Sequence, residues 1–191
     1  MLWGLVLCGL AACQPFVEPP GAERTAPQMF ANAYRANDGT MLPLRTWEPE
    51  GAPRAVVLGL HGFGDYANAF EAVGKQFAAA GIRTVAYDQR GFGKAPGRGR
   101  WHGVGRMKQD AADAVALLAK RDAPAPVYVL GLSMGGAIGM TMAARHPEAP
   151  VAGLAFVAPA VWGPAVNAVG TAAGPLAFSP RDPLVSGQRP G

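Results

Sequence analysis

The motif G-L-S-M-G at residues 131–135 constrains the fold of this chain more than any other segment. A short apolar, β-prone run precedes it at residues 127–130, and residues 136–140 have the composition of a helix start. Between a strand and a helix, a G-x-S-x-G motif forms a turn so tight that a Cβ at either glycine would crowd it. The turn strains the serine backbone and holds its hydroxyl out at the carboxyl edge of the sheet. We therefore expect Ser133 to be a catalytic nucleophile rather than part of an ordinary tight turn.

Apolar runs that alternate with helical patterns indicate how the rest of the chain folds. Continuous apolar strands are expected at residues 54–60, 83–87, 127–130 and 151–157, and helices at 67–80, 107–121 and from the serine turn to about 146. Strands of this kind belong to a parallel sheet buried on both faces, and the intervening helices imply right-handed crossovers. The expected fold class is therefore α/β, with four neighbouring parallel strands.

An antiparallel hairpin is expected before these strands. Residues 29–35 and 41–47 flank the turn signal Asn37-Asp38-Gly39-Thr40. Pro43 in the second strand lacks an N–H group, which favours a position at the edge of the sheet.

A second glycine-rich motif, H-G-F-G at residues 61–64, follows directly after the apolar strand that ends at Leu60. In this arrangement the loop after that strand supplies one N–H group to an oxyanion, and the residue after the nucleophile supplies another. Those donors are predicted to be the backbone N–H groups of Phe63 and Met134. His61 is interpreted as a hydrogen-bonded residue that shapes the loop, in preference to a general base.

Four motifs in this order resemble the monoacylglycerol lipase and lysophospholipase branch of the α/β-hydrolases, which is often grouped with serine aminopeptidase-like hydrolases. They are H-G-F-G at 61–64, Y-D-Q-R-G-F-G at 87–93, R-G-R-W at 98–101 and G-L-S-M-G-G at 131–136. The resemblance covers about residues 29–163. It implies an α/β-hydrolase fold that hydrolyses small esters or single-chain lipids without a metal or other cofactor. Asp88 and Arg90 are interpreted as structural, as an ion pair that braces their loop.

Such an enzyme also needs a base for the serine proton and an acid to orient that base, and both follow the serine in this fold. After Ser133 the only histidine is His146, and the only acidic residues are Glu148 and Asp182. His146 lies thirteen residues along the expected helix, a distance of about 20 Å at 1.5 Å per residue. It is interpreted as a cation at the helix end, and His102 as a surface residue. No histidine in the sequence therefore fits the role of the base.

The composition changes after Trp162 and becomes rich in Ala, Gly, Pro and Ser. Residues 164–191 are interpreted as a low-complexity tail, disordered or non-native, after a hydrolase core at residues 29–163. We expect the core to lack the C-terminal strands and the lid, as in a fragment or frame-shifted product, which exposes a sheet edge and apolar surface. Three interpretations stay open: a serine ester hydrolase with little or no activity in this chain, a serine aminopeptidase-like hydrolase, and a non-catalytic fragment.

The N-terminal residues 1–12 are almost wholly apolar and too short to span a bilayer as a helix. They fit the apolar region of a signal peptide, and Leu10-Ala11-Ala12-Cys13 resembles a bacterial lipobox. That resemblance implies cleavage before Cys13 and lipid attachment to its sulfur, although no Lys or Arg precedes the apolar run. Residues 14–28, with four prolines up to Pro27, are interpreted as a tether. The expectation is a membrane-anchored lipoprotein of the bacterial cell envelope, and the alternative is a buried apolar segment.

The chain has a net charge of +4, and many of its basic residues lie between positions 83 and 108. These residues are Arg83, Arg90, Lys94, Arg98, Arg100, Arg106 and Lys108. Nucleic acid is not expected as a partner because no stacking motif or nucleic-acid-binding fold accompanies the charge. A solvated loop that faces anionic lipid headgroups is the favoured interpretation, and the oligomeric state is left open.

Overall fold

A single mixed sheet organises the computed structural model, which describes residues 16–19 and 21–161. Its seven strands lie in the order β1-β2-β3-β5-β4-β6-β7. The strands are β1 (Gln28–Met29), β2 (Ala33–Arg35), β3 (Met41–Trp47), β4 (Ala55–Leu60), β5 (Ile82–Tyr87), β6 (Val127–Leu132) and β7 (Gly153–Val157). The helices are the 3-10 turn η1 (Ala67–Phe70), α1 (Glu71–Ala79), α2 (Gly103–Asp122) and α3 (Met134–Arg145).

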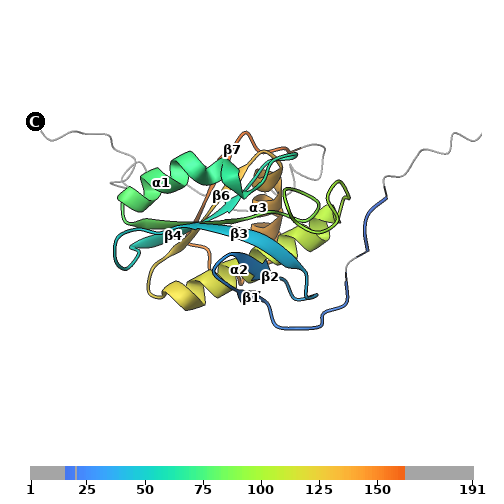
Figure 1. The fold of residues 1–191 in the computed structure, drawn as a ribbon, viewed down its shortest axis with the longest axis horizontal. Coiled ribbons are helices and arrows are strands. Elements are labelled where there is room, and N and C mark those ends of the chain that lie inside the picture. Colours follow the sequence, from blue (N-terminus) through green and yellow to red (C-terminus); the bar gives the residue numbers. More distant parts are fainter. Residues whose placement is uncertain (1–15, 20, 162–191) are drawn as a thin grey trace, which may run out of the picture.

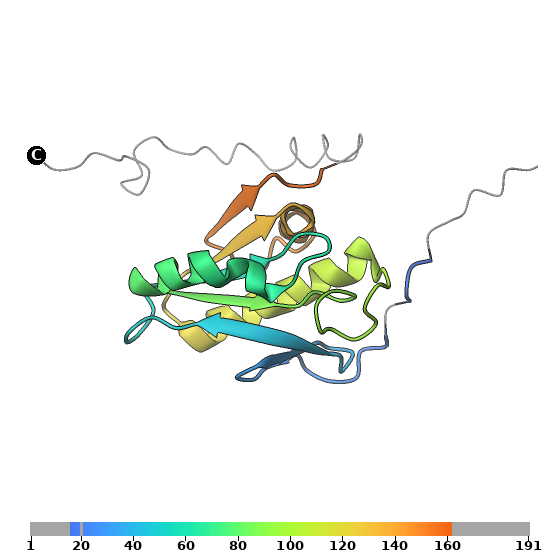
Figure 2. The same cartoon turned by 45° about the horizontal axis from the view of Figure 1, so that its top comes forward.

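The four strands β5, β4, β6 and β7 are parallel neighbours, as predicted. The chain steps from β4 to β5 in one direction and then returns past β4 to β6 and β7. Because the crossovers are right-handed, this reversal places α1 on one face of the sheet and α2 and α3 on the other (Figures 1 and 2). The loops that follow β4 and β6 therefore leave toward opposite faces of the sheet at its carboxyl edge.

The sheet separates two clusters of buried apolar side chains. The larger cluster lies between the sheet and helices α2 and α3, and includes Leu58, Val115 and Ile138. The smaller one lies under α1, where Trp47 and Phe70 pack. Apolar burial on both faces explains why the central strands are continuously hydrophobic in sequence.

The hairpin is present, but the single strand expected at residues 29–35 is divided into β1 and β2, which pair antiparallel with each other. The prediction that the second strand of the hairpin lies at an edge was also wrong. β3 pairs antiparallel with β2 through residues 41–43 and with β5 through residues 44–47. Pro43 lies where the pairing changes from one neighbour to the other, so its missing N–H group does not interrupt the β5 ladder. Its carbonyl still accepts a hydrogen bond from the Asp88 N–H group at 2.8 Å.

The described part of the predicted tether follows the domain surface. Val17 forms an isolated parallel bridge with Trp101, and the N–H groups of Arg24 and Thr25 donate to the Asn37 carbonyl at 2.8 and 3.0 Å. Residues 1–15, with Cys13, and the interpreted tail at 164–191 lie outside the described residues. In the part that the structure describes, no helix is both long and apolar enough to cross a membrane.

Candidate active site

Ser133 lies in a strained turn between β6 and α3, as the G-x-S-x-G motif predicts. Its backbone has φ 48° and ψ −112°, in the left-handed half of conformational space that side chains rarely occupy. Its N–H group donates to the Val157 carbonyl at 2.9 Å, and its carbonyl accepts from Ala160 at 3.0 Å. The last residue of β7 and the segment just after it thus bond to the backbone N–H and carbonyl groups of Ser133. These hydrogen bonds help the fold to maintain a backbone conformation that costs energy.

The motif glycines are required by close backbone packing. A Cβ on Gly131 would lie 2.6 Å from the Gly136 Cα atom. A Cβ on Gly135 would lie only 1.9 Å from the Leu60 carbonyl oxygen. The first turn of α3 therefore packs directly on the end of β4, and this contact brings the serine turn beside the loop that follows β4.

That loop is the H-G-F-G segment, and the structure places it next to Ser133. The position of a Cβ on Gly62 lies 3.5 Å from the Ser133 Cβ. Phe63 is 75% exposed and packs edge-on against Phe92 with ring centroids 5.2 Å apart. Met134 is the first residue of α3, so its N–H group has no partner within the helix. Proximity of the loop and the helix start fits an oxyanion site, and the roles of the Phe63 and Met134 N–H groups stay predictions.

His61 is fully buried, and both of its ring nitrogens have partners. The Gln89 N–H group donates to Nε2 at 2.9 Å, so the ring proton lies on Nδ1, which donates to the Gly62 carbonyl at 2.8 Å. Burial lowers the pKa of His61 and keeps it neutral. These bonds support the loop-shaping interpretation over a general base.

Two consecutive residues after β5 hold the two ends of the loop at 61–67. The Gln89 side-chain amide donates to the His61 carbonyl at 2.8 Å, at the start of the loop. Asp88 accepts hydrogen bonds from the N–H groups of Ala67 at 2.9 Å, at its end, and of Lys94 at 2.8 Å. The position of Phe63 therefore depends on residues from a neighbouring strand.

Arg90 does not pair with Asp88, and that part of the sequence interpretation was wrong. Its Nε atom donates to Asp110 at 2.6 Å, and its Nη1 atom to Asp38 at 2.8 Å. Arg106 contacts the same two carboxylates, Asp38 at 3.2 Å and Asp110 at 3.4 Å. Asp88 is unsuited to pairing because backbone N–H groups already occupy both of its oxygens.

This four-residue network is buried and ties three distant segments together. It joins the β2–β3 hairpin turn, the loop after β5 and the first half of α2. Burial alone would raise the pKa of Asp38, but hydrogen bonds from Arg90 and Thr40 hold it well below its usual range. The spacing of Arg106 and Asp110 at i and i+4 on one helix is the sequence signal for this part of the network.

The other two histidines lie at helix ends, His146 after α3 and His102 before α2. His146 ends α3 and pairs with Glu148 at 3.1 Å, so the expectation of a helix-end residue is confirmed. His102 was expected at the surface, but it is half-buried before α2, with its ring beside Gly97 of the preceding loop. Among the described residues, no histidine is hydrogen-bonded to Ser133 and no cluster of side chains is suited to hold a metal ion.

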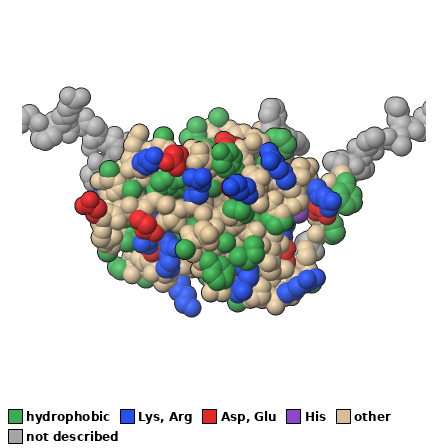
Figure 3. Space-filling model, viewed as in Figure 1, with side chains coloured by type: hydrophobic (Ala, Val, Ile, Leu, Met, Phe, Trp, Pro, Cys, Tyr) green, Lys and Arg blue, Asp and Glu red, His purple; other side chains and the backbone are tan. Residues whose placement is uncertain are grey.

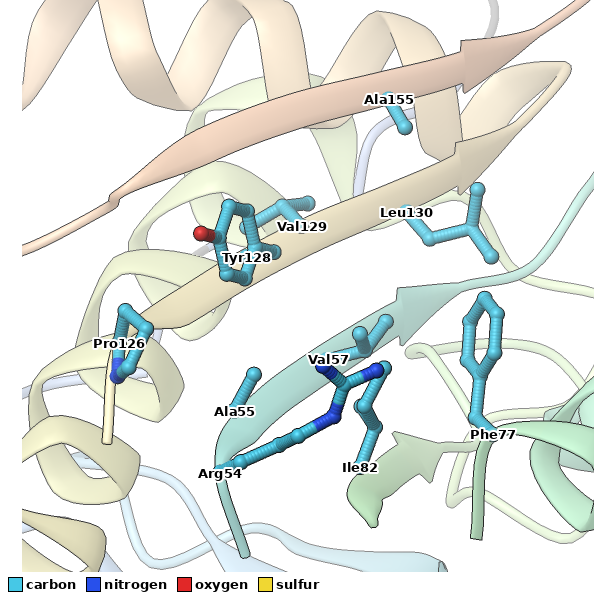
Figure 4. A pocket seen from close by; sticks show the side chains of 10 residues that line it. All are labelled: Arg54, Ala55, Val57, Phe77, Ile82, Pro126, Tyr128, Val129, Leu130 and Ala155. Carbon is cyan, nitrogen blue, oxygen red and sulfur yellow. The ribbon is translucent and has the colours of Figure 1, made fainter. Parts of the chain in front are cut away.

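The cavity shown in Figure 4 does not belong to this site. It has a volume of about 410 Å³ and lies on the α1 side of the sheet, over β4 and β6, with Tyr128, Leu130, Phe77 and Ala155 among its lining side chains. Val157, on the same strand as Ala155, is 56% exposed. Among the described residues, apolar side chains of β6 and β7 thus remain accessible on this face of the sheet.

The neutral state of His61 can be tested through the dependence of folding stability on pH. Its pKa is lower in the folded chain than in the unfolded chain, so the unfolded state binds the extra proton. Stability contributed by the neutral ring is complete above the unfolded pKa of about 6.5 and is lost as the pH falls below it. We expect urea unfolding between pH 7.5 and 5.5 to show a smaller pH dependence in His61→Gln than in the wild type. His146→Gln, at the far end of α3, is the matched control and should keep the wild-type dependence; equal slopes for both variants would contradict the assignment.

The comparisons with known proteins agree with this geometry. Residues 51–179, about two thirds of the chain, match the family described as "Serine aminopeptidase, S33". The chain belongs to this hydrolase family. It is 34% identical over 139 residues to the monoacylglycerol lipase of Mycolicibacterium smegmatis, covering 72% of this chain and 47% of the lipase. It is also 31% identical to human monoglyceride lipase, covering 65% and 41% of the two chains.

Solved structures confirm the α/β-hydrolase fold. A thermostable carboxyl esterase from Bacillus coagulans superposes with a TM-score of 0.58 at 26% identity, covering 70% of this chain and 44% of the esterase. An esterase from Exiguobacterium antarcticum gives a TM-score of 0.57 at 27% identity, with 69% and 46% covered. The chain therefore spans less than half the length of these family relatives, and carries a lipase- or esterase-type α/β-hydrolase fold.

Proposed function

We propose that this chain carries the nucleophile and the oxyanion site of a serine ester hydrolase of the monoacylglycerol lipase type. One observation carries the proposal: Ser133 has a positive φ at the start of α3 and lies beside the glycine loop after β4. An ordinary serine at a helix start has no need of this strain, whereas a nucleophile held out at the sheet edge does.

The chemistry follows from the positions of the groups. The Ser133 oxygen attacks the ester carbonyl, and the carbonyl oxygen gains negative charge beside the N–H groups of Phe63 and Met134. Each such donor contributes about 3–4 kcal/mol to transition-state stabilisation. The serine proton must pass to a base. None of the described histidines is placed to take that proton, so this chain alone is proposed to be inactive or weakly active.

The substrate class rests on the relatives. Monoacylglycerol and monoglyceride lipases are among the similar proteins, which favours single-chain lipids and small esters. The family description favours the alternative, a serine aminopeptidase-like hydrolase. Lipid attachment at Cys13 and a place in the bacterial cell envelope complete the proposal, and they rest on residues 10–13 of the sequence alone.

Complementation tests the catalytic roles. We expect the 191-residue chain to hydrolyse p-nitrophenyl butyrate at little more than the background rate. Adding a C-terminal segment that carries the missing strands, an Asp and a His should raise turnover by about 10³-fold or more, because a base and its acid are then supplied. Ser133→Ala should remove the gain, whereas Thr25→Ala, an exposed hydroxyl, should keep it.

The outcomes separate the alternatives. Turnover by the complemented chain that survives Ser133→Ala would rule out this nucleophile. Strong turnover by the chain alone, lost on Ser133→Ala, would refute the inactive state. Faster cleavage of an aminoacyl p-nitroanilide than of the ester would favour the peptidase.

A further inference from the structure

The loop before α2 and the first turns of that helix carry basic charge without any acidic residue. Residues 91–109 contain five Lys or Arg side chains and no Asp or Glu. Arg106 is buried in the ion network, but Lys94, Arg98 and Arg100 are exposed. The proposed ester chemistry at Ser133 makes no use of these three charges.

Apolar side chains lie beside this charge because the chain segment before β1 docks on the same loop. The Glu18 N–H group donates to the Trp101 carbonyl at 2.8 Å, and Val17 packs beside Gly103, 3.0 Å from the position of its Cβ. Phe16 is 73% exposed and Val17 47%. Phe16 and Trp101 line a shallow hollow of about 540 Å³ with Arg100.

These residues form one end of the molecule, which we call the basic end: residues 16–18, 94 and 98–104. Figure 2 shows the docked segment and the loop together at the end toward which β6 and β7 point. In Figure 3, basic and hydrophobic side chains lie next to one another at this end. The nucleophile Ser133 follows β6, so it lies at the same edge of the sheet.

Few acidic groups oppose this charge. Glu18 pairs with Arg100 at 2.8 Å and neutralises one of the three exposed cations. Asp88 is buried, with both carboxylate oxygens occupied by N–H groups. Within the described residues, Lys94 and Arg98 form no ion pair. Residues 1–15 contain no charged side chain that could neutralise them.

We propose that the basic end binds an anionic phospholipid surface. Lys94 and Arg98 contact headgroup phosphates, and the side chains of Phe16, Val17 and Val104 enter the interfacial region. A surface that combines cations with exposed apolar side chains matches such a membrane better than nucleic acid, which offers no apolar layer. The docked segment supplies most of the apolar part, so the surface exists only in the folded chain.

The position of Cys13 is consistent with this orientation. Only two residues separate it from Phe16, so an extended chain over these three Cα–Cα steps spans at most about 11 Å. A lipid on Cys13 would hold the basic end, and not the opposite edge of the sheet, against the bilayer. The binding proposal does not require this lipid, because the charges and apolar side chains lie in the described residues.

Vesicle co-sedimentation of the full chain tests the proposal. We expect the chain to bind vesicles that mix phosphatidylcholine with phosphatidylglycerol more strongly than vesicles of pure phosphatidylcholine. The binding to the anionic vesicles should weaken at high salt, because salt screens the charges. The double variant Lys94→Glu with Arg98→Glu should bind the anionic vesicles at least about tenfold more weakly, because each basic side chain near such a surface contributes measurably. Phe16→Ser should weaken binding to both kinds of vesicle.

The matched control is Lys120→Glu with Arg145→Glu, which makes the same charge change at the C-terminal ends of α2 and α3. These helices run back from the carboxyl edge, so both residues lie at the opposite edge of the sheet. The control should keep wild-type binding, and circular dichroism should show that both double variants are folded. Equal losses in the two double variants would overturn the proposal, as would equal binding to neutral vesicles. Tighter binding to a DNA duplex than to the anionic vesicles would assign the surface to nucleic acid instead.

Discussion

Gly135→Ala should destabilise the chain by more than about 4 kcal/mol, enough to unfold many domains of this size. The new methyl group would lie 1.9 Å from the Leu60 carbonyl oxygen, a backbone atom at the end of β4 that cannot rotate away. Relief requires α3 to move off the sheet, which disrupts both the Ser133 turn and the neighbouring glycine loop. Urea unfolding followed by circular dichroism measures the loss.

Gly105→Ala is the matched control because it makes the same chemical change inside α2. A Cβ at that position meets no atom within 4 Å. Alanine is a better helix former than glycine by about 1 kcal/mol, so this variant should be neutral or slightly stabilised. Equal stability of the two variants would show that α3 does not press on β4 as the structure indicates.

Arg90→Met should cost about 3–5 kcal/mol in the free energy of unfolding. The substitution removes a buried cation and leaves the Asp38 and Asp110 carboxylates facing each other with Arg106 as their remaining partner. Breaking a buried ion pair on one side is costly because the other charge stays desolvated. Thermal and urea unfolding at neutral pH measure the effect.

The control for Arg90 is Lys75→Met, which removes the exposed partner of Glu71 on α1. An exposed pair of this kind is screened by solvent and contributes little, so this variant should stay close to wild-type stability. Arg90→Lys keeps the charge but loses the planar fork that reaches both carboxylates, so its stability should lie between the other two. Equal stability of Arg90→Met and Lys75→Met would show that the buried ion network does not stabilise the contact between the hairpin, the loop after β5 and α2.

Gly135 and Arg90 both help to hold the serine turn beside the loop that follows β4. Gly135 sets how closely the serine turn approaches β4, and residues 88–90 set how the loop after β4 is held. Asp88 and Gln89 bond to the ends of that loop, and Arg90 anchors their own segment to the hairpin and to α2. The proposed oxyanion site is therefore supported by contacts that reach well beyond its own motifs.

Elements with a local cause could be predicted from the amino-acid pattern. Continuous apolar runs predicted β4 to β7, and the turn signal at residues 37–40 predicted the hairpin. The glycines around Ser133 predicted a strained turn, because only a residue without a Cβ fits where two backbones nearly touch. The position of a candidate nucleophile between a strand and a helix could be inferred for the same reason.

Contacts between segments far apart in the chain could not be predicted and are seen only in the folded protein. Arg90 is 52 residues from Asp38 and 20 from Asp110, and local periodicity contains no information about which charges meet at such separations. Pro43 argued for an edge strand, yet β3 lies inside the sheet because its pairing changes partner at that residue. His102 had the sequence surroundings of a surface loop, but folding packs its ring among glycines. Burial and pairing of polar side chains depend on the whole packed arrangement, whereas apolar periodicity and turn glycines act within a few residues of chain.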